Sequence, residues 1–245
     1  STNLVNCIYQ DSKGFMWFGT QEGLNRYDGY KIKIYKHEPN KSNSLSYSEV
    51  NCLLELKNNT MLVGTPNGVN FLSLTNDSIY RLIFDTKDYN AKENHVTVIK
   101  QIDETEVAIG TRNGIVICNI NKKDFKYFPF SIDDEVLVKD IEVDKGRLLI
   151  ATLKKGLWTL DLNSKKFGRV TFADEEKVSE GVLGLESINK LCLYGGNLYL
   201  ATDGAGVYKV DPKTFLIEGQ KKFKLNYSDR NHIKDFLIKE GTVYC

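Results

Sequence analysis

A short phrase recurs five times along this chain and decides which folds it can adopt. Each copy has a small residue, then a threonine, and then, three or four residues later, a glycine followed by an aliphatic residue. The threonines stand 41 to 50 residues apart, at Thr20, Thr65, Thr111, Thr152 and Thr202. A period of this length indicates one supersecondary unit that is copied along the chain.

The first copy predicts four short strands joined by tight turns. Residues 5–10 and 15–20 are rich in apolar side chains, and the sequence Asp-Ser-Lys-Gly lies between them. Residues 24–27 form a third short run, and residues 31–36 alternate polar with apolar, as in a half-exposed strand. No segment of the chain has sustained helical periodicity. The unit is therefore predicted to be an antiparallel meander in an all-β protein.

Polarity rises across each unit, from two apolar strands to a polar fourth strand such as residues 221–224. Small sheets with a buried inner side and a solvated outer strand pack around an axis, which predicts a β-propeller. The residue before each threonine is expected where neighbouring inner strands crowd together; these residues are Gly19, Gly64, Gly110, Ala151 and Ala201. The glycines after the threonines are expected to supply backbone conformations that a Cβ forbids; they are Gly23, Gly68, Gly114, Gly156 and Gly206.

The repeat boundaries predict one incomplete propeller domain over residues 1–245. The expected units are residues 4–48, 49–95, 96–137, 138–187 and 188–232, followed by a partial unit at 233–245. About five and a half four-stranded antiparallel blades are thus expected, from a propeller that closes with about seven. The last unit stops inside its first hairpin. This would leave a strand with unpaired backbone groups at its edge, which natural proteins avoid because such edges promote aggregation. The chain is therefore expected to be a fragment of a longer polypeptide.

Composition argues against several classes of function. The 33 basic and 32 acidic residues nearly cancel and are scattered, so no basic face for nucleic acid is expected. No apolar run approaches the length of a membrane span. The five cysteines form no Cys-x-x-Cys pair, and with three histidines no metal site or other cofactor is expected. Cys7 and Cys52 occupy the same position in successive units and are expected to be buried free thiols.

The run from Asn6 to Gly29 carries a family resemblance. It contains Gln-Asp-Ser-Lys-Gly-Phe-Met-Trp-Phe-Gly-Thr-Gln-Glu-Gly-Leu-Asn-Arg-Tyr-Asp-Gly and closely resembles the two-component regulator propeller repeat. Residues 35–46 are similar to the bridge that joins the blades of that family. Later units keep the threonine and glycine but lose the tryptophan, which is replaced by Leu62, Val107, Leu149 and Tyr199.

The resemblance implies the sensor region of a hybrid two-component system histidine kinase of the Bacteroidetes type. Such regions are periplasmic seven-bladed propellers, commonly two in tandem, followed by further domains, a membrane helix and the kinase. Many members are similar to regulators of polysaccharide utilisation. The resemblance therefore implies an oligosaccharide ligand, the remaining propeller and downstream domains as partners in the same polypeptide, and a homodimer. Kinase and DNA-binding activities have no residues in this chain to which they correspond.

Candidate ligand-binding residues lie on the face where the connectors between blades meet the turns after each threonine. Sugars bind flat aromatic rings and paired polar side chains, and loops on a rigid scaffold commonly carry function. The candidates are Glu22, Asn67, Arg112, Asn113 and Asp203 in the turns and Tyr47, Tyr89 and Tyr227 in or beside the long connectors. The alternative is that these side chains are merely solvated. Trp17, next to a crowded strand, is expected in the core rather than in a sugar site.

Three functions remain open for such a chain. The favoured one is a binding module that senses an oligosaccharide and signals through a change in domain arrangement. An enzyme such as a glycosidase or lyase would need a close pair of acidic groups. Acidic residues are plentiful but lie in different connectors without a shared motif, so no catalytic residue is expected; they include Asp88, Asp133, Asp134, Glu175 and Glu176. The third is a scaffold for protein–protein contacts.

Overall fold

The computed structural model of the chain describes residues 4–85, 87, 91–130, 135–173, 185–221, 231–239 and 242–244. Within these ranges the chain is built mainly from β-strands, with 3₁₀ turns at Lys92–Asn94 and at residues 185–186. Contacts divide it into two compact units, Ser1–Glu135 and Val136–Cys245, which are described in turn. None of the helical structure in the described ranges is long and apolar enough to cross a bilayer.

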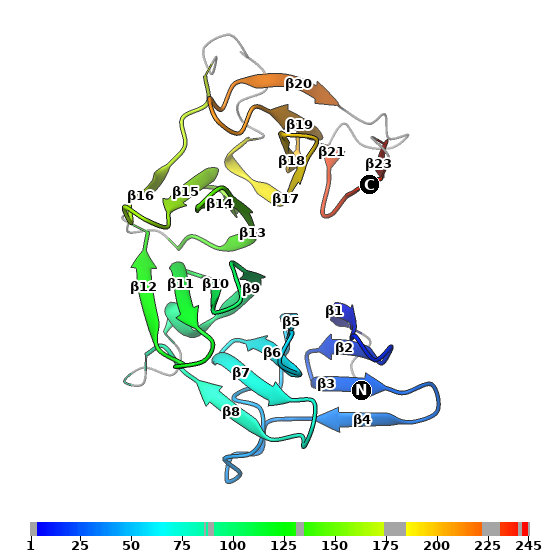
Figure 1. Cartoon of the computed structure of the whole chain (residues 1–245). Helices are drawn as coiled ribbons and strands as arrows, with labels where there is room; N and C mark the ends of the chain where they lie inside the picture. The colour runs from blue at the N-terminus through cyan, green and yellow to red at the C-terminus, as the bar shows by residue number, and fades with distance from the viewer. Residues whose placement is uncertain are drawn as a thin grey trace. The chain divides into compact units, whose positions relative to one another are not determined.

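The first unit contains three four-stranded antiparallel sheets, each with its strands in sequence order (Figure 1). The first sheet consists of β1 (Val5–Gln10), β2 (Met16–Thr20), β3 (Gly23–Tyr27) and β4 (Ile32–Tyr35). The second consists of β5 (Cys52–Leu56), β6 (Thr60–Thr65), β7 (Gly68–Ser73) and β8 (Ile79–Leu82). The third consists of β9 (Val96–Gln101), β10 (Glu106–Thr111), β11 (Gly114–Asn119) and β12 (Phe125–Pro129).

The second unit contains two further meanders and a hairpin. The fourth sheet consists of β13 (Val138–Asp144), β14 (Arg147–Thr152), β15 (Leu157–Asp161) and β16 (Phe167–Arg169). The fifth consists of β17 (Ile188–Tyr194), β18 (Asn197–Gly204), β19 (Val207–Val210) and β20 (Ile217–Lys221), and β21 (Asn231–His232) pairs with the end of β18. The hairpin is formed by β22 (Leu237–Lys239) and β23 (Thr242–Tyr244).

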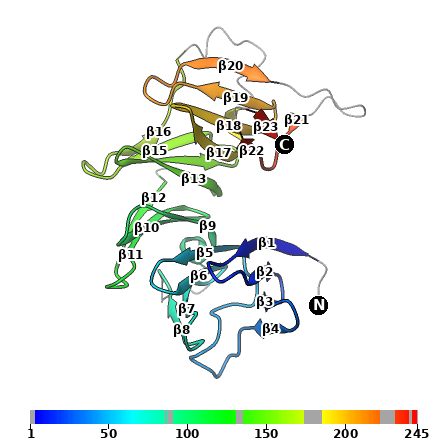
Figure 2. The same cartoon turned by 45° about the vertical axis from the view of Figure 1, so that its right-hand side comes forward.

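Sheets within each unit pack through their first strands. In the first unit β1 contacts β5 and β5 contacts β9, and the two views show these strands side by side (Figure 2). In the second unit β13 contacts β17, which contacts β22. Apolar side chains fill the space between neighbouring sheets, while the fourth strands lie at the outer edge. The predicted all-β class with four-stranded antiparallel propeller blades is therefore confirmed, and closure with seven blades stays a prediction.

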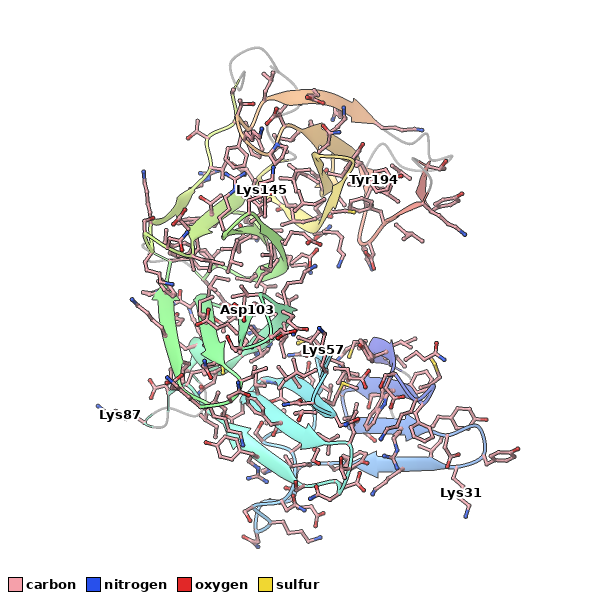
Figure 3. The ribbon with its side chains drawn as sticks, viewed as in Figure 1. Lys31, Lys57, Lys87, Asp103, Lys145 and Tyr194 are labelled. Atoms are coloured by element: carbon pink, nitrogen blue, oxygen red, sulfur yellow. The ribbon has the colours of Figure 1, made fainter. Side chains whose placement is uncertain are left out.

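The first turn of each sheet is the predicted tight hairpin. Figure 3 labels one residue of this turn in four of the sheets: Lys57, Asp103, Lys145 and Tyr194. Asn59 adopts a φ of 58°, Lys145 a φ of 46° and Gly146 a φ of 83°. Asparagine and glycine tolerate this left-handed conformation, which a two-residue hairpin needs.

The recurring threonine closes the turn between the second and third strands. In each of the five sheets its Oγ1 donates a hydrogen bond to the carbonyl oxygen of the glycine that follows. The distances are 2.9 Å from Thr20, 3.1 Å from Thr65 and Thr111, 2.6 Å from Thr152 and 2.8 Å from Thr202. The same oxygen accepts a backbone N–H from inside the turn in the first, second, third and fifth sheets. The repeated phrase is therefore a structural turn.

The glycine before the threonine allows two sheets to approach. A Cβ on Gly64 would lie 2.4 Å from Cys52 Sγ and 2.6 Å from a methyl of Val96 in the next sheet. Gly19 has the same surroundings, formed by Cys7 and Val50. The expected crowding is thus confirmed at Gly19 and Gly64, and Cys7 and Cys52 are half-buried free thiols packed against these glycines. Burial raises the pKa of the Cys7 thiol to about 11, so it stays protonated and unreactive.

The expectation for the later glycine holds for most sheets but is wrong for Gly114. Gly68, at the matching position, has a φ of 86°. Gly114 lies outside the left-handed region, and its lack of a side chain serves close approach instead. A Cβ there would lie 2.4 Å from the carbonyl oxygen of Phe128 on the neighbouring strand β12.

Trp17 belongs to the core, as predicted. Its ring is fully buried, and Nε1 donates a 2.7 Å hydrogen bond to Asp11 Oδ2. The other oxygen of Asp11 accepts the backbone N–H groups of Lys13 and Phe15 in the first hairpin. The aspartate therefore joins the turn to the core.

The sixth unit begins with a segment that precedes its first strand. Residues 233–236 come before β22, which starts at Leu237. The backbone N–H of Ile233 donates instead to the carbonyl oxygen of Thr202 in the fifth sheet, and Asn189 donates a side-chain hydrogen bond to the Ile233 carbonyl. Val50 makes the matching backbone contact to Thr20 and receives the matching bond from Asn6. This segment therefore attaches to the preceding sheet before its own sheet starts.

One face of the first sheet is exposed and apolar. The pairing places Ile8, Phe18, Asn25 and Ile34 in one row across the sheet. Ile8 and Ile34 are 61% and 56% exposed. In the second sheet the same row contains Val63 and Asn70, which are fully buried against the first sheet. We call the exposed surface around Ile8 and Ile34 the open face.

Candidate functional site

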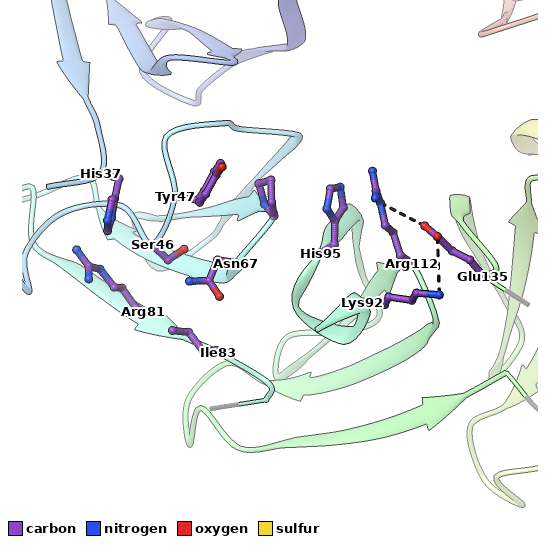
Figure 4. A pocket seen from close by; sticks show the side chains of 11 residues that line it. His37, Ser46, Tyr47, Asn67, Arg81, Ile83, Lys92, His95, Arg112 and Glu135 are labelled. Atoms are coloured by element: carbon purple, nitrogen blue, oxygen red, sulfur yellow. Dashed lines mark ion pairs between the residues drawn. The ribbon is translucent and has the colours of Figure 1, made fainter. Parts of the chain in front are cut away.

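A pocket of about 650 Å³ lies in the first unit, where connectors between sheets meet the turns after the threonines (Figure 4). The connector into the second sheet contributes His37, Ser46 and Tyr47, and the one into the third sheet contributes Lys92 and His95. The remaining lining residues are Pro66 and Asn67 on the β6–β7 turn, Arg81 and Ile83 at the end of β8, Arg112 on the β10–β11 turn and Glu135 after β12.

Ser46 is fixed in the wall by the second sheet. Its backbone N–H donates a 2.8 Å hydrogen bond to Asn70 Oδ1, and Asn70 Nδ2 donates to the Ser46 hydroxyl at 3.0 Å. The same hydroxyl lies 2.9 Å from Thr65 Oγ1. The neighbouring Tyr47 is 49% exposed, so its ring can be covered by a ligand. The connector therefore presents a flat aromatic group from a rigid backbone.

Arg81, on β8, hydrogen-bonds to the same connector. Its Nε donates to the carbonyl oxygen of Ser44 at 2.7 Å, and Nη2 donates to the carbonyl of Lys41 at 2.6 Å and to the Ser44 hydroxyl. Burial lowers the pKa of Arg81, although a guanidinium remains charged at neutral pH. Within the described ranges Arg81 has no acidic partner.

Two cations share one carboxylate at the other end of the pocket. Arg112 Nε lies 3.6 Å from Glu135 Oε1, and Lys92 Nζ lies 3.9 Å from Glu135 Oε2, as Figure 4 shows. All three side chains are partly exposed, so water and salt screen these contacts. The pairs orient the side chains more than they stabilise the fold.

His95 lies between these two ends as a neutral ring. Burial lowers its pKa to about 4, and the positive charge of Arg112 acts in the same direction, against the opposing charge of Glu135. At neutral pH the ring thus offers one N–H donor and one nitrogen acceptor. A ligand can use both for hydrogen bonds.

Asn67 contributes an unsatisfied polar atom. Its Oδ1 is buried and has no hydrogen-bond partner in the described part of the chain, while its backbone N–H donates to Thr65 Oγ1 at 3.1 Å. Buried polar atoms without a partner are uncommon in native proteins and call for an explanation. Asn67 also lines the pocket, so this unpaired acceptor lies in its wall.

The described lining of the pocket contains one carboxylate, Glu135. Most glycosidases place two carboxyl groups beside the scissile bond. The described ranges also contain no group of three or more His, Cys, Asp and Glu side chains able to hold a metal ion. Polar side chains, an aromatic ring and cations suit a hydrophilic ligand held by hydrogen bonds.

The structure brings together three of the residues predicted from the sequence: Tyr47, Asn67 and Arg112 all line the pocket. Asn113 is adjacent, but its Nδ2 donates to Glu93 at 3.2 Å. Glu22 occupies the matching turn of the first sheet, outside the lining, and Asp203 belongs to the second unit, where its backbone pairs with His232. Tyr89 and Tyr227 lie outside the described residues. A role in ligand binding stays a prediction for all eight.

Sequence reasoning missed the other lining residues, which are His37, Ser46, Pro66, Arg81, Ile83, Lys92, His95 and Glu135. His37 lies in the connector after β4, and His95 lies in the connector after β8. The recurrence of a histidine in two successive connectors could have indicated the site. Arg81 gave no such signal, because a charged residue on a fourth strand reads as solvated. Ser46 resembles any loop serine until its contact with Thr65 is seen.

Comparisons with known proteins agree on the repeat and the fold. Residues 1–22 match the family described as two component regulator propeller. A stretch of 46 residues, 19% of this chain, is 46% identical to Histidine kinase P4 of Formosa agariphila and covers 3% of that protein.

Solved structures resemble nearly the whole chain. The extracellular domain of the putative hybrid two component system BT3049 from B. thetaiotaomicron matches 97% of this chain with a TM-score of 0.64 and 22% identity. The corresponding domain of BT4673 from the same organism matches 96% with a TM-score of 0.62 and 19% identity. This chain spans 37% and 35% of those two chains, and at such identities the likeness shows a shared fold.

The matched repeat at the N-terminus is the segment whose Asp11, Trp17 and Thr20 build the first hairpin, the core and the closing turn. The other sheets reproduce the threonine turn with changed core residues. Residues 1–22 of this chain therefore match the two-component regulator propeller repeat, and the chain has the β-propeller fold found in the extracellular domains of putative hybrid two-component systems.

Proposed function

We propose that this chain is an extracytoplasmic, periplasmic sensor module of a hybrid two-component signalling protein, and that the pocket of the first unit binds an oligosaccharide. The repeat and the shared fold support the sensor role. The observation that carries the binding role is the pocket itself. Connectors and turns of successive sheets converge there, and hydrogen bonds to the sheets hold its wall in place.

The lining has the two features that sugars require. The C–H face of a sugar ring packs on an aromatic ring, and Tyr47 offers one with half of its surface free. Sugar hydroxyls both donate and accept hydrogen bonds, and Asn67 and His95 can meet them with acceptors and donors. The volume of about 650 Å³ falls within the ordinary range of small-ligand sites.

Signalling then follows from differential binding. A ligand shifts an equilibrium between two arrangements of the full protein only when it binds one of them more tightly. The rest of the polypeptide, in a dimer, would convert this shift into a change of kinase activity. The chain itself supplies recognition and has no catalytic role in this proposal.

Calorimetric titration of the purified protein with a panel of oligosaccharides tests the proposal. For a glycan that binds, Tyr47→Ala is expected to weaken affinity about tenfold, because the stacking surface is lost. Tyr30→Ala is the matched control, since Tyr30 is 95% exposed on the β3–β4 turn and does not line the pocket. Absence of binding to every glycan, or equal losses in the two variants, would refute the proposal, and release of shortened sugars would indicate an enzyme.

A further inference from the structure

The charges of the described pocket lining are unbalanced. It includes three cationic side chains, Arg81, Lys92 and Arg112, and one carboxylate, Glu135. Arg81 donates its hydrogen bonds to backbone and hydroxyl oxygens, which leave its charge uncompensated. Lys92 and Arg112 both lie near the same carboxylate, so one negative charge serves two positive ones. The described lining thus has an excess of positive charge.

Arg112 is the cation whose geometry is ready for a ligand. Its Nε lies 3.6 Å from Glu135 Oε1, and its two terminal nitrogens donate no hydrogen bond within the described ranges. Figure 4 shows the end of this guanidinium lying beyond the contact with Glu135. Two parallel N–H groups in a plane match the oxygens of a carboxylate or sulfate, which they can bind in a bidentate manner.

The backbone beneath Arg112 is rigid. The side chain starts from the β10–β11 turn, where Thr111 Oγ1 donates to the Gly114 carbonyl at 3.1 Å and accepts the Asn113 N–H at 3.2 Å. Glu135 then limits the rotation of the guanidinium. The turn therefore fixes the point from which the Arg112 side chain starts, and this reduces the ordering of the backbone that binding requires.

The neighbours of Arg112 add donors of the same kind. Lys92 reaches the same carboxylate from the 3₁₀ turn, and the neutral His95 ring can turn an N–H toward an anion. Asn67 and Tyr47 lie farther along the same wall (Figure 4). A ligand with an acidic group at one end and hydroxyl groups along its length would meet a complementary partner at each position.

From this arrangement we infer that the pocket selects acidic oligosaccharides, whose carboxylate or sulfate ester is bound by Arg112 with help from Lys92. The inference rests on the proposed function, because it names the class of oligosaccharide that the same pocket takes. A charge-assisted hydrogen bond contributes more than a neutral one. An acidic sugar is therefore expected to bind about ten to a hundred times more tightly than its neutral counterpart.

Matched pairs of ligands test this selectivity on the purified protein. Tetragalacturonate and its carboxyl-reduced form, galactotetraose, differ by a carboxylate in place of a hydroxymethyl group on each ring. Neocarrabiose 4-sulfate and neocarrabiose differ by one sulfate ester, and the second sugar is neutral. Calorimetry should show tighter binding of the acidic member in at least one pair, and the preference should shrink as sodium chloride is raised. The pair that shows the preference distinguishes carboxylate from sulfate.

Variants of Arg112 then assign the preference to this residue. Arg112→Gln should abolish the difference between acidic and neutral members, and Arg112→Lys should keep part of it, because the charge remains while the planar fork is lost. The control is Lys57→Gln, which removes an exposed, ion-paired cation from the first hairpin of the second sheet, outside the pocket lining. This control should bind like the unmodified protein.

The outcomes separate the two proposals. Equal affinity for acidic and neutral members overturns the inference and leaves the proposed function standing. A preference that survives in Arg112→Gln overturns the assignment to Arg112. Failure to bind any member of either pair, together with failure of the wider panel, overturns both proposals.

Discussion

The hydroxyl oxygens of Ser46 and Thr65 lie 2.9 Å apart, so the connector entering the second sheet is joined to the threonine that closes the turn of that sheet. Ser46 lines the pocket, and Thr65 is fully buried in the repeated turn. A residue that every unit needs for its backbone thus also positions the wall of the candidate site. Effects on stability and on binding are expected to be coupled here.

Replacing Thr65 with valine preserves the shape of the side chain and removes its hydroxyl. The change leaves the Gly68 carbonyl, the Asn67 N–H and the Ser46 hydroxyl each without one partner. The free energy of unfolding is expected to fall by about 2–3 kcal/mol in urea denaturation. Thr20→Val is the matched control, because Thr20 makes the two turn bonds at a half-buried site without a described connector partner. A loss in Thr20→Val as large as in Thr65→Val would contradict the coupling.

A methyl group at Gly64 should force two sheets apart. Its Cβ would lie 2.4 Å from Cys52 Sγ and 2.6 Å from Val96 in the third sheet. Gly64→Ala is expected to lower the free energy of unfolding by about 1–3 kcal/mol. Adding Cys52→Ala should restore part of this loss by removing the closer contact. Gly168→Ala, where nothing lies within 4 Å, should change stability by less than about 0.5 kcal/mol.

Lys190 neutralises a buried carboxylate in the second unit. Asp140 is 5% exposed, and its Oδ2 accepts the Leu191 N–H at 2.9 Å and lies 3.3 Å from Lys190 Nζ. Lys190→Met should lower the free energy of unfolding by about 3 kcal/mol, because the charge remains buried without its partner.

The loss at Lys190 should depend on pH in a defined direction. Burial raises the pKa of Asp140, so the folded state binds the proton more tightly than the unfolded state. The variant should therefore be relatively more stable at low pH and lose stability as the pH rises through the folded-state pKa. The double variant Asp140→Asn, Lys190→Met should recover stability and lack this dependence. Urea denaturation at several pH values measures both effects.

His95 should make the protein less stable in mild acid. Its pKa is lowered from 6.5 to about 4 by burial and by Arg112. Between these values the unfolded state binds the proton and the folded state does not, so the free energy of unfolding falls as the pH falls from about 6.5 toward 4. His95→Gln should remove this part of the pH dependence. Parallel slopes for the two proteins across that interval would show that the ring titrates normally.

Periodicity in the sequence was sufficient to predict the sheets, since each copy of the phrase specifies the same turn. The residues 5–10 were predicted as the strand that β1 forms, and Trp17 was placed correctly in the core. Predictions from the repeat were wrong where the residues around a repeated position differ between sheets. Gly114 keeps the glycine without the left-handed backbone, because the nearby Phe128 carbonyl imposes the same choice by a different route.

The candidate site was predictable in location but only partly in composition. Connectors and threonine turns were expected on one face, and three residues predicted there line the pocket. Arg81 and His95 were not predicted as site residues. A sequence pattern indicates which face of a strand a residue occupies, but it does not indicate how far a connector covers that residue. Asp140 shows the same limit: a charged residue in a strand reads as exposed, although its neighbours bury it.

The open face around Ile8 and Ile34 has a practical consequence for any study of residues 1–245 in solution. Water in contact with such an area of hydrocarbon raises the free energy, and two molecules can lower it by meeting at this surface. Molecules at high concentration would then associate. The ligand-to-protein stoichiometry measured by titration would then refer to the associated species rather than to single chains. Measurement at low protein concentration, or the variant Ile34→Lys, would keep the measured species monomeric.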